Sequence, residues 1–104
     1  MALLGNPFVA NVTKRMSNDE TIQAIRVDLT GELEAIIGYE AHAMSTDDER
    51  VKKVLFHIAD EERQHVGELQ QLLYILCPKE AEHTEKGKQA IVQQQQQNFQ
   101  SQMQ

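Results

Sequence analysis

A mostly apolar seam, with steps alternating between three and four residues, runs along two long stretches of this chain. In the first stretch, about residues 18–44, the seam consists of Ile22, Ile25, Leu29, Glu32, Ile36, Tyr39 and Ala43. In the second, about residues 47–76, it consists of Val51, Leu55, Ile58, Glu62, His65, Leu69, Leu72 and Leu76. This heptad spacing predicts two long amphipathic helices.

Boundary signals indicate where these helices begin and end. Ser17 with Glu20, and Thr46 with Glu49, match the capping-box pattern of a helix N-terminus. Pro78 should end the second helix, because the residue before a proline is disfavoured in helical conformation. Since the connection between the two helices is very short, they should lie side by side and antiparallel.

The ends of the chain show a different pattern. Residues 1–16 lack a helical period and predict an extended arm that packs on a neighbour. Residues 79–92 predict a third, shorter helix, and residues 93–104 form a Gln-rich tail that either continues this helix or frays. The predicted domains are therefore the arm (1–16), a two-helix domain with a short third helix (17–92), and a low-complexity tail (93–104).

The predicted fold class is all-α, an antiparallel two-helix hairpin plus a short C-terminal helix. Second apolar stripes, formed by Leu33 and Ile37 on the first helix and by Val66 and Leu73 on the second, give each helix more than one apolar face. A chain of 104 residues can bury only a small core by itself. We therefore expect dimerisation to complete a four-helix bundle.

Composition excludes several kinds of protein. The net charge is −6 with only 10 Lys and Arg, so we expect no binding to nucleic acid. The single cysteine, Cys77, excludes an internal disulfide and a Cys-rich metal site. No stretch approaches the roughly 20 apolar residues of a membrane span. The N-terminus lacks the basic and apolar regions of a secretory signal, so the expected location is cytoplasmic.

Three polar residues, Glu32, Glu62 and His65, interrupt the seam. A buried carboxylate is costly unless it is paired or binds a metal ion. Glu62 and His65 are three residues apart, one turn on the same helix face, whereas Glu61 points about 100° away from Glu62. We therefore predict that Glu32, Glu62 and His65 bind metal and that Glu61 does not.

One Glu together with one Glu-x-x-His motif is half of a carboxylate-bridged di-iron centre. Counted from residue 45, the levels of these residues along the hairpin differ by roughly 6–10 Å, which is not a tight match within one chain. We therefore expect two identical chains to complete the centre, with two irons per dimer. Carboxylates with one imidazole suit iron or manganese, and zinc can compete.

The motifs Gly-Glu-Leu-Glu-Ala-Ile-Ile-Gly-Tyr-Glu at 31–40 and Ala-Asp-Glu-Glu-Arg-Gln-His at 59–65 resemble the encapsulated-ferritin family of the ferritin/rubrerythrin-like superfamily. The likeness covers roughly residues 18–90. It implies a ferritin-like dimer with the di-iron centre between subunits, within a ring such as a decamer. By this resemblance Glu32, Glu62 and His65 bind iron, Tyr39 is a catalytic residue beside them, and Glu34 occupies an outer position on the route of incoming metal.

This sequence departs from the family pattern in two ways. Gly31 and Gly38 stand where family members often carry an acid and an aromatic residue. The chain also ends in glutamines without a targeting peptide of the Leu-Thr-x-Gly-Ser-Leu kind. The resemblance implies an encapsulin nanocompartment as a partner and location, and the missing peptide leaves packaging open.

The predicted function is a ferroxidase that oxidises Fe(II) to Fe(III) in iron storage or detoxification. One alternative is a metal-binding helical assembly without enzymatic activity. Another is a rubrerythrin-like peroxide reductase, which is disfavoured because the chain has no Cys-x-x-Cys module to deliver electrons.

Overall fold

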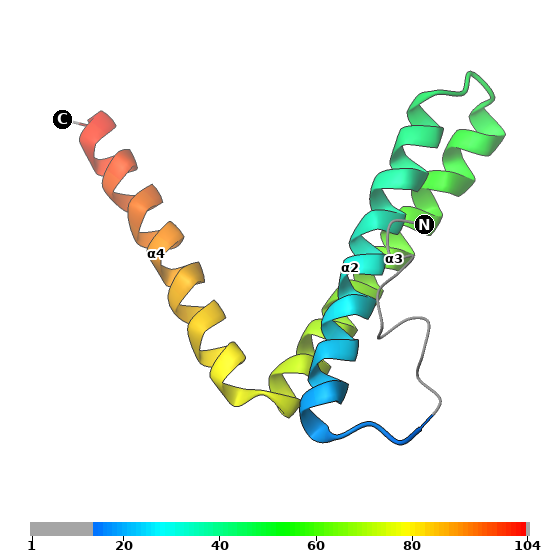
Figure 1. Cartoon of the computed structure of the whole chain (residues 1–104). Coiled ribbons are helices and arrows are strands. Elements are labelled where there is room, and N and C mark those ends of the chain that lie inside the picture. Colours follow the sequence, from blue (N-terminus) through cyan, green and yellow to red (C-terminus); the bar gives the residue numbers. More distant parts are fainter. Residues whose placement is uncertain (1–13, 104) are drawn as a thin grey trace.

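The computed structural model describes residues 14–103 and contains three helices in that range, α2 (Asn18–Met44), α3 (Glu49–Leu76) and α4 (Pro78–Met103). Helices α2 and α3 form an antiparallel hairpin, and α4 leaves the base of this hairpin and diverges from it (Figure 1). Since residues 14–103 form no strand, the prediction of an all-α fold with an antiparallel hairpin is confirmed. The predicted arm falls largely outside these residues.

The N-terminus of α2 carries the predicted capping box. The Ser17 hydroxyl accepts a hydrogen bond from the Glu20 amide at 3.2 Å, and the Glu20 carboxylate accepts one from the Ser17 amide at 3.0 Å. The bond from the Ser17 amide lowers the pKa of Glu20, because it stabilises the ionised carboxylate. Two otherwise free amides are thereby satisfied, and α2 has the bounds that the pattern predicted.

The predicted capping box of Thr46 and Glu49 is wrong. Asp48 is the N-cap of α3 and accepts a hydrogen bond from the Arg50 amide at 3.0 Å, while the Thr46 hydroxyl accepts from the Asp48 amide at 3.2 Å. An ionised carboxylate is a stronger acceptor than a hydroxyl and interacts favourably with the helix dipole. Asp48 therefore takes the capping role, and α3 begins at Glu49 rather than near residue 47.

Helix α4 is longer than predicted. Pro78 follows α3 directly and is also the first residue of α4. A proline has no backbone N–H, but the first amides of a helix have no hydrogen-bond partner within the helix, so nothing is lost at this position. The third helix predicted over residues 79–92 is present, and of the two alternatives for the glutamine run the structure has the one in which it continues this helix, to Met103. Glutamine is a good helix former, and no Gly or Pro follows Gly87 before Met103.

An ion pair fixes the first turn of α4 to the hairpin. The Arg26 guanidinium on α2 donates two hydrogen bonds to the Glu80 carboxylate on α4, one of them from Nε at 3.3 Å. The hydrogen bond lowers the pKa of Glu80 and raises that of Arg26. Every residue from Glu82 to Met103 is exposed, so this pair is the main polar tie described between α4 and α2.

The buried core is very small. Among residues 14–103, only Ala43, Ala59 and Leu73 are fully buried apolar side chains. The radius of gyration is 18.3 Å, compared with about 13 Å for a compact domain of this length. Twelve large apolar side chains are exposed: Leu33, Ile37, Met44, Val51, Val54, Phe56, Leu72, Ile75, Ile91, Val92, Phe99 and Met103. No helix in the described part of the chain combines the length and apolar character needed to cross a membrane.

The predicted seam of α3 is not its most buried line. The deepest positions are Ala59 and Leu73, with half-buried Val66 midway between them at a spacing of seven. The seam residues Val51 and Leu72 are exposed. Within the hairpin, α3 is therefore rotated so that its seam lies at the edge of the contact with α2, partly open to solvent.

Candidate metal centre

The hairpin brings Glu32 and Glu62 to the same level. Glu32 lies 12 residues before the end of α2 at Met44, and Glu62 lies 13 residues after the start of α3 at Glu49. At about 1.5 Å per residue, the two levels agree to within roughly one residue. The predicted offset between these levels was therefore too large. The count from residue 45 included residues 45–48, which lie outside both helices and cross the end of the hairpin.

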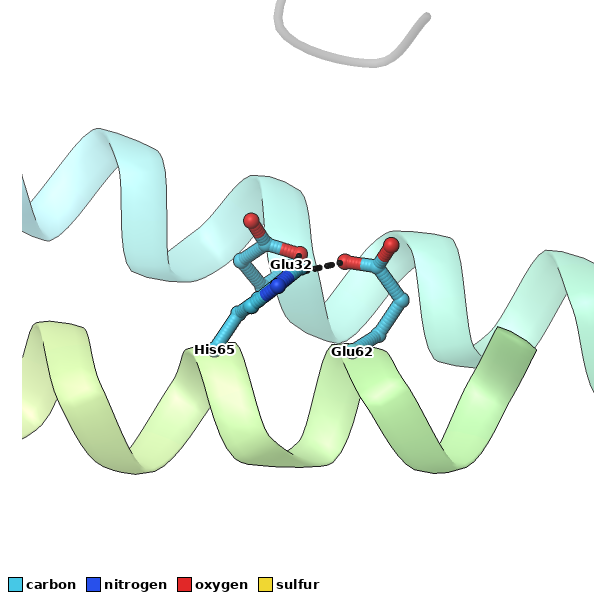
Figure 2. Close-up of side chains that lie close together, drawn as sticks. All are labelled: Glu32, Glu62 and His65. Atoms are coloured by element: carbon cyan, nitrogen blue, oxygen red, sulfur yellow. Dashed lines mark hydrogen bonds and ion pairs between the residues drawn. The ribbon is translucent and has the colours of Figure 1, made fainter. Parts of the chain in front are cut away.

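Three side chains from the two helices converge between α2 and α3 (Figure 2). His65 Nδ1 lies 3.3 Å from a Glu62 carboxylate oxygen and 3.6 Å from a Glu32 carboxylate oxygen. One ligand atom from each of the three residues falls within 4.8 Å of the other two. The exposed fraction of the side chain is 18% for Glu62, 26% for Glu32 and 48% for His65, so the group is partly open to solvent in a single chain.

This donor set fits a transition-metal ion. Ligand atoms at roughly 2.0–2.2 Å from one ion can be up to about 4.4 Å apart, so only a small closing movement of the three side chains is required. Two carboxylates and one imidazole suit iron or manganese, with zinc as a competitor. His65 Nδ1 must lose any proton that it shares with Glu62 before it can bind a metal. The three residues supply half of the ligands that a two-metal centre requires.

An arginine beside the group ties the two helices together. Arg63 on α3 donates to Glu40 on α2 at 2.6 Å and to Asp60 on its own helix at 2.9 Å. The bond to Glu40 is the largest cause of a raised pKa for Arg63. This exposed pair adds little stability, but it restrains the rotation of α3 next to Glu62.

The structure separates the two adjacent glutamates as predicted. Glu61 points away from the group and pairs with His57 at 3.0 Å on an exposed flank of α3. Glu62 instead faces Glu32 and His65 (Figure 2). A matched pair of neighbouring carboxylates, one within the candidate site and one outside it, is thereby available for experiments.

Tyr39 and Glu34 are not brought into this group. Tyr39 is half-buried two turns after Glu32, and its hydroxyl forms no hydrogen bond within residues 14–103. Glu34 follows Glu32 by two residues, which places it on nearly the opposite side of α2. At Gly38, a Cβ atom would meet nothing within 4 Å, so that face of α2 is open in a single chain. The roles assigned to Tyr39 and Glu34 stay predictions.

One residue of the site was missed from the sequence. A surface pocket of about 260 Å³ beside the group is lined by Glu32, His65, Glu68 and Leu69. Glu68 lies one turn after His65 on α3, which is the signal that could have revealed it. It was overlooked because it stands one position away from the seam residue Leu69.

Known proteins resemble this chain over most of its length. Residues 9–86 match the EncFtn-like family model. The encapsulin nanocompartment cargo protein EncC of Myxococcus xanthus is 40% identical over 78 residues, which cover 75% of this chain and 60% of that protein. A ferritin-like-encapsulin shell fusion protein of Pyrococcus furiosus is 39% identical over 75 residues, covering 72% of this chain and 22% of that protein.

The fold also matches a solved structure. The crystal structure of the encapsulated ferritin domain from Pyrococcus furiosus superposes with a TM-score of 0.75 at 35% identity, over 83% of this chain and 88% of that one. This chain spans about 60% of the length of EncC and a smaller share of the fusion protein. The match therefore concerns the helical unit that contains Glu32, Glu62 and His65.

Proposed function

This chain belongs to the EncFtn-like family, and we propose that it is a ferroxidase whose two-iron site forms between two copies of the chain. The observation that carries this proposal is the convergence of Glu32, Glu62 and His65 at one level of the hairpin. These residues supply half of the ligands of a di-iron carboxylate centre. A second copy would supply the other half.

Ferrous iron is the substrate of the proposed reaction. Each ion gives up one electron, and the two electrons from a pair of ions, with two protons from solvent, reduce dioxygen to hydrogen peroxide or hydrogen peroxide to two water molecules. The negative carboxylates of Glu32 and Glu62 bind the ions and favour the more highly charged ferric product. His65 supplies the nitrogen ligand through Nδ1, the atom that faces both carboxylates.

The exposed surface of a single chain supports a shared site. The seam of α3 lies at the edge of the intrachain contact, and twelve large apolar side chains among residues 14–103 are exposed. Packing two hairpins together would cover such surfaces and complete a four-helix bundle. We propose a homodimer of this kind, within a larger ring such as a decamer.

The proposed biological setting follows from the relatives. EncC is an encapsulin nanocompartment cargo protein, and the Pyrococcus furiosus relative is fused to an encapsulin shell. We therefore propose that this chain acts in iron storage or detoxification in the cytoplasm, inside an encapsulin shell. An open ring has no closed cavity, so a separate shell would be needed to retain ferric mineral.

Iron oxidation in air distinguishes the candidate functions. Fe(II) is added to the protein, to a His65→Ala variant and to buffer, and ferric absorbance is followed with time. We expect rapid oxidation with the wild type only. Metal binding without oxidation faster than in buffer would instead favour a non-enzymatic metal-binding assembly.

A further inference from the structure

The pocket beside the candidate site gives access to two of its ligands. Glu32 and His65 form part of its wall, and the rest is formed by Glu68 and Leu69. In a single chain, the pocket is therefore a path by which an ion could reach Glu32 and His65 from solvent before a second copy completes the site. Glu34, on nearly the opposite side of α2 from Glu32, does not line it.

Exposure increases along α3 toward this opening. Glu62 is the most buried ligand, His65 is about half-exposed, and Glu68, one turn further, is exposed. The three residues follow each other at steps of three, so each lies one turn further along the helix and about 60° further around it. The outer end of the site therefore lies at Glu68.

Among residues 14–103, no neighbour neutralises the carboxylate of Glu68. Nearby acids on α3 have partners, since Asp60 pairs with Arg63 and Glu61 pairs with His57. Glu68 forms no ion pair or side-chain hydrogen bond with any residue from 14 to 103, and no Lys or Arg lines the pocket. Its charge is therefore available to a cation that approaches from solvent.

We propose that Glu68 captures hydrated divalent cations at the mouth of this pocket and delivers them to Glu32 and His65. This inference rests on the proposed function, in which ferrous iron is the cation. Glu68 lines the pocket but is not part of the group of ligand atoms that Glu32, Glu62 and His65 form within 4.8 Å, so it attracts and holds the ion on its way in and does not belong to the final ligand set. A charge at the mouth of a concave site raises the rate of capture more than its final affinity.

Cobalt(II) loading tests this role without relying on oxidation. Co(II) is mixed rapidly with the protein at low ionic strength, and its absorption bands report binding over time. In Glu68→Gln we expect loading to slow by at least about threefold and to depend less on salt. The final number of bound Co(II) ions and their spectrum should equal those of the wild type. Glu61→Gln, which removes a neighbouring carboxylate outside the pocket, should load at the wild-type rate.

Several results would overturn this role. Unchanged loading in Glu68→Gln would do so, as would equal slowing in Glu61→Gln, which would indicate only a general charge effect. Fewer bound ions in Glu68→Gln would make it a ligand of the final site instead. If the His65→Ala variant binds Co(II) as the wild type does, the proposed metal site itself is wrong. If the wild type binds Co(II) as expected and Glu68→Gln loads at the wild-type rate, only the inference about Glu68 is overturned and the proposed metal site stands.

Discussion

Adjacent glutamates on α3 allow the site to be tested at the scale of single residues. Glu62 faces Glu32 and His65, while Glu61 pairs with His57 on the exposed flank. We expect Glu62→Ala to abolish Fe(II) oxidation because a ligand is lost, and Glu61→Ala to retain most of it. Initial rates of ferric absorbance measure both. If Glu61→Ala is inactive while Glu62→Ala remains active, the metal ligand on α3 is Glu61 and not Glu62, and the site assignment is wrong.

The charge of the site should also affect the metal-free assembly. In the proposed dimer, Glu32 and Glu62 from both copies bring four carboxylates close together, and their repulsion opposes association. Glu32→Gln should therefore lose iron oxidation while its metal-free dimer is at least as stable as that of the wild type. Sedimentation equilibrium without metal measures the dissociation constant. A dimer clearly weakened by Glu32→Gln would show that this carboxylate supports the interface by itself.

At the scale of helices, the attachment of α4 should depend on pH. The hydrogen bond from Arg26 lowers the pKa of Glu80 below its ordinary value of 4.5. A lowered pKa in the folded state means that the ion pair stabilises the fold above pH 4.5 and that this stabilisation is lost as the pH falls through the lowered pKa. Because the pair is partly exposed, Glu80→Gln should cost about 0.5–1 kcal/mol at neutral pH and nothing in strong acid.

Unfolding free energies of wild type and Glu80→Gln at several pH values measure this contribution. Glu82→Gln is the matched control, since Glu82 lies in the same turn of α4 but pairs only with the exposed Lys86. It should have no measurable effect at any pH. A cost for Glu80→Gln that persists in strong acid would mean that the ion pair is not its source.

The sequence predicted helices better than it predicted how they pack. Heptad spacing and Ser17 gave α2 correctly, and helical geometry separated Glu62 from Glu61, because both depend on local periodicity. The rotation of α3 was not predictable in this way. It depends on which of two apolar stripes packs more closely on α2, and the stripe that contains Ala59 and Leu73 is buried more deeply than the seam.

Other differences have similar causes. The start of α3 was predicted two residues early because two acceptors, Thr46 and Asp48, compete for the cap. The predicted offset between Glu32 and Glu62 along the hairpin was too large because it was counted from residue 45 and included residues 45–48, which cross the end of the hairpin. Glu68 was missed because its role depends on a pocket between two helices, which no periodicity in one helix can show.

At the scale of the whole molecule, one chain has more apolar surface than core. Three apolar residues are fully buried among those described, while twelve large ones are exposed. Exposed apolar surface of this extent marks an interaction surface. In the proposed dimer the candidate site is half of a centre, so the same association would cover the apolar surface and complete the ligand set.

The central claim is that two chains share one two-metal site, and an anaerobic metal titration followed by native mass spectrometry tests it most directly. Fe(II) is added stepwise to the metal-free protein, and the mass of each assembly gives the number of chains and ions. We expect two ions per dimer, roughly 3.5–4 Å apart, and no metal-loaded monomer. A folded monomer that binds its own fully coordinated ion would contradict the claim.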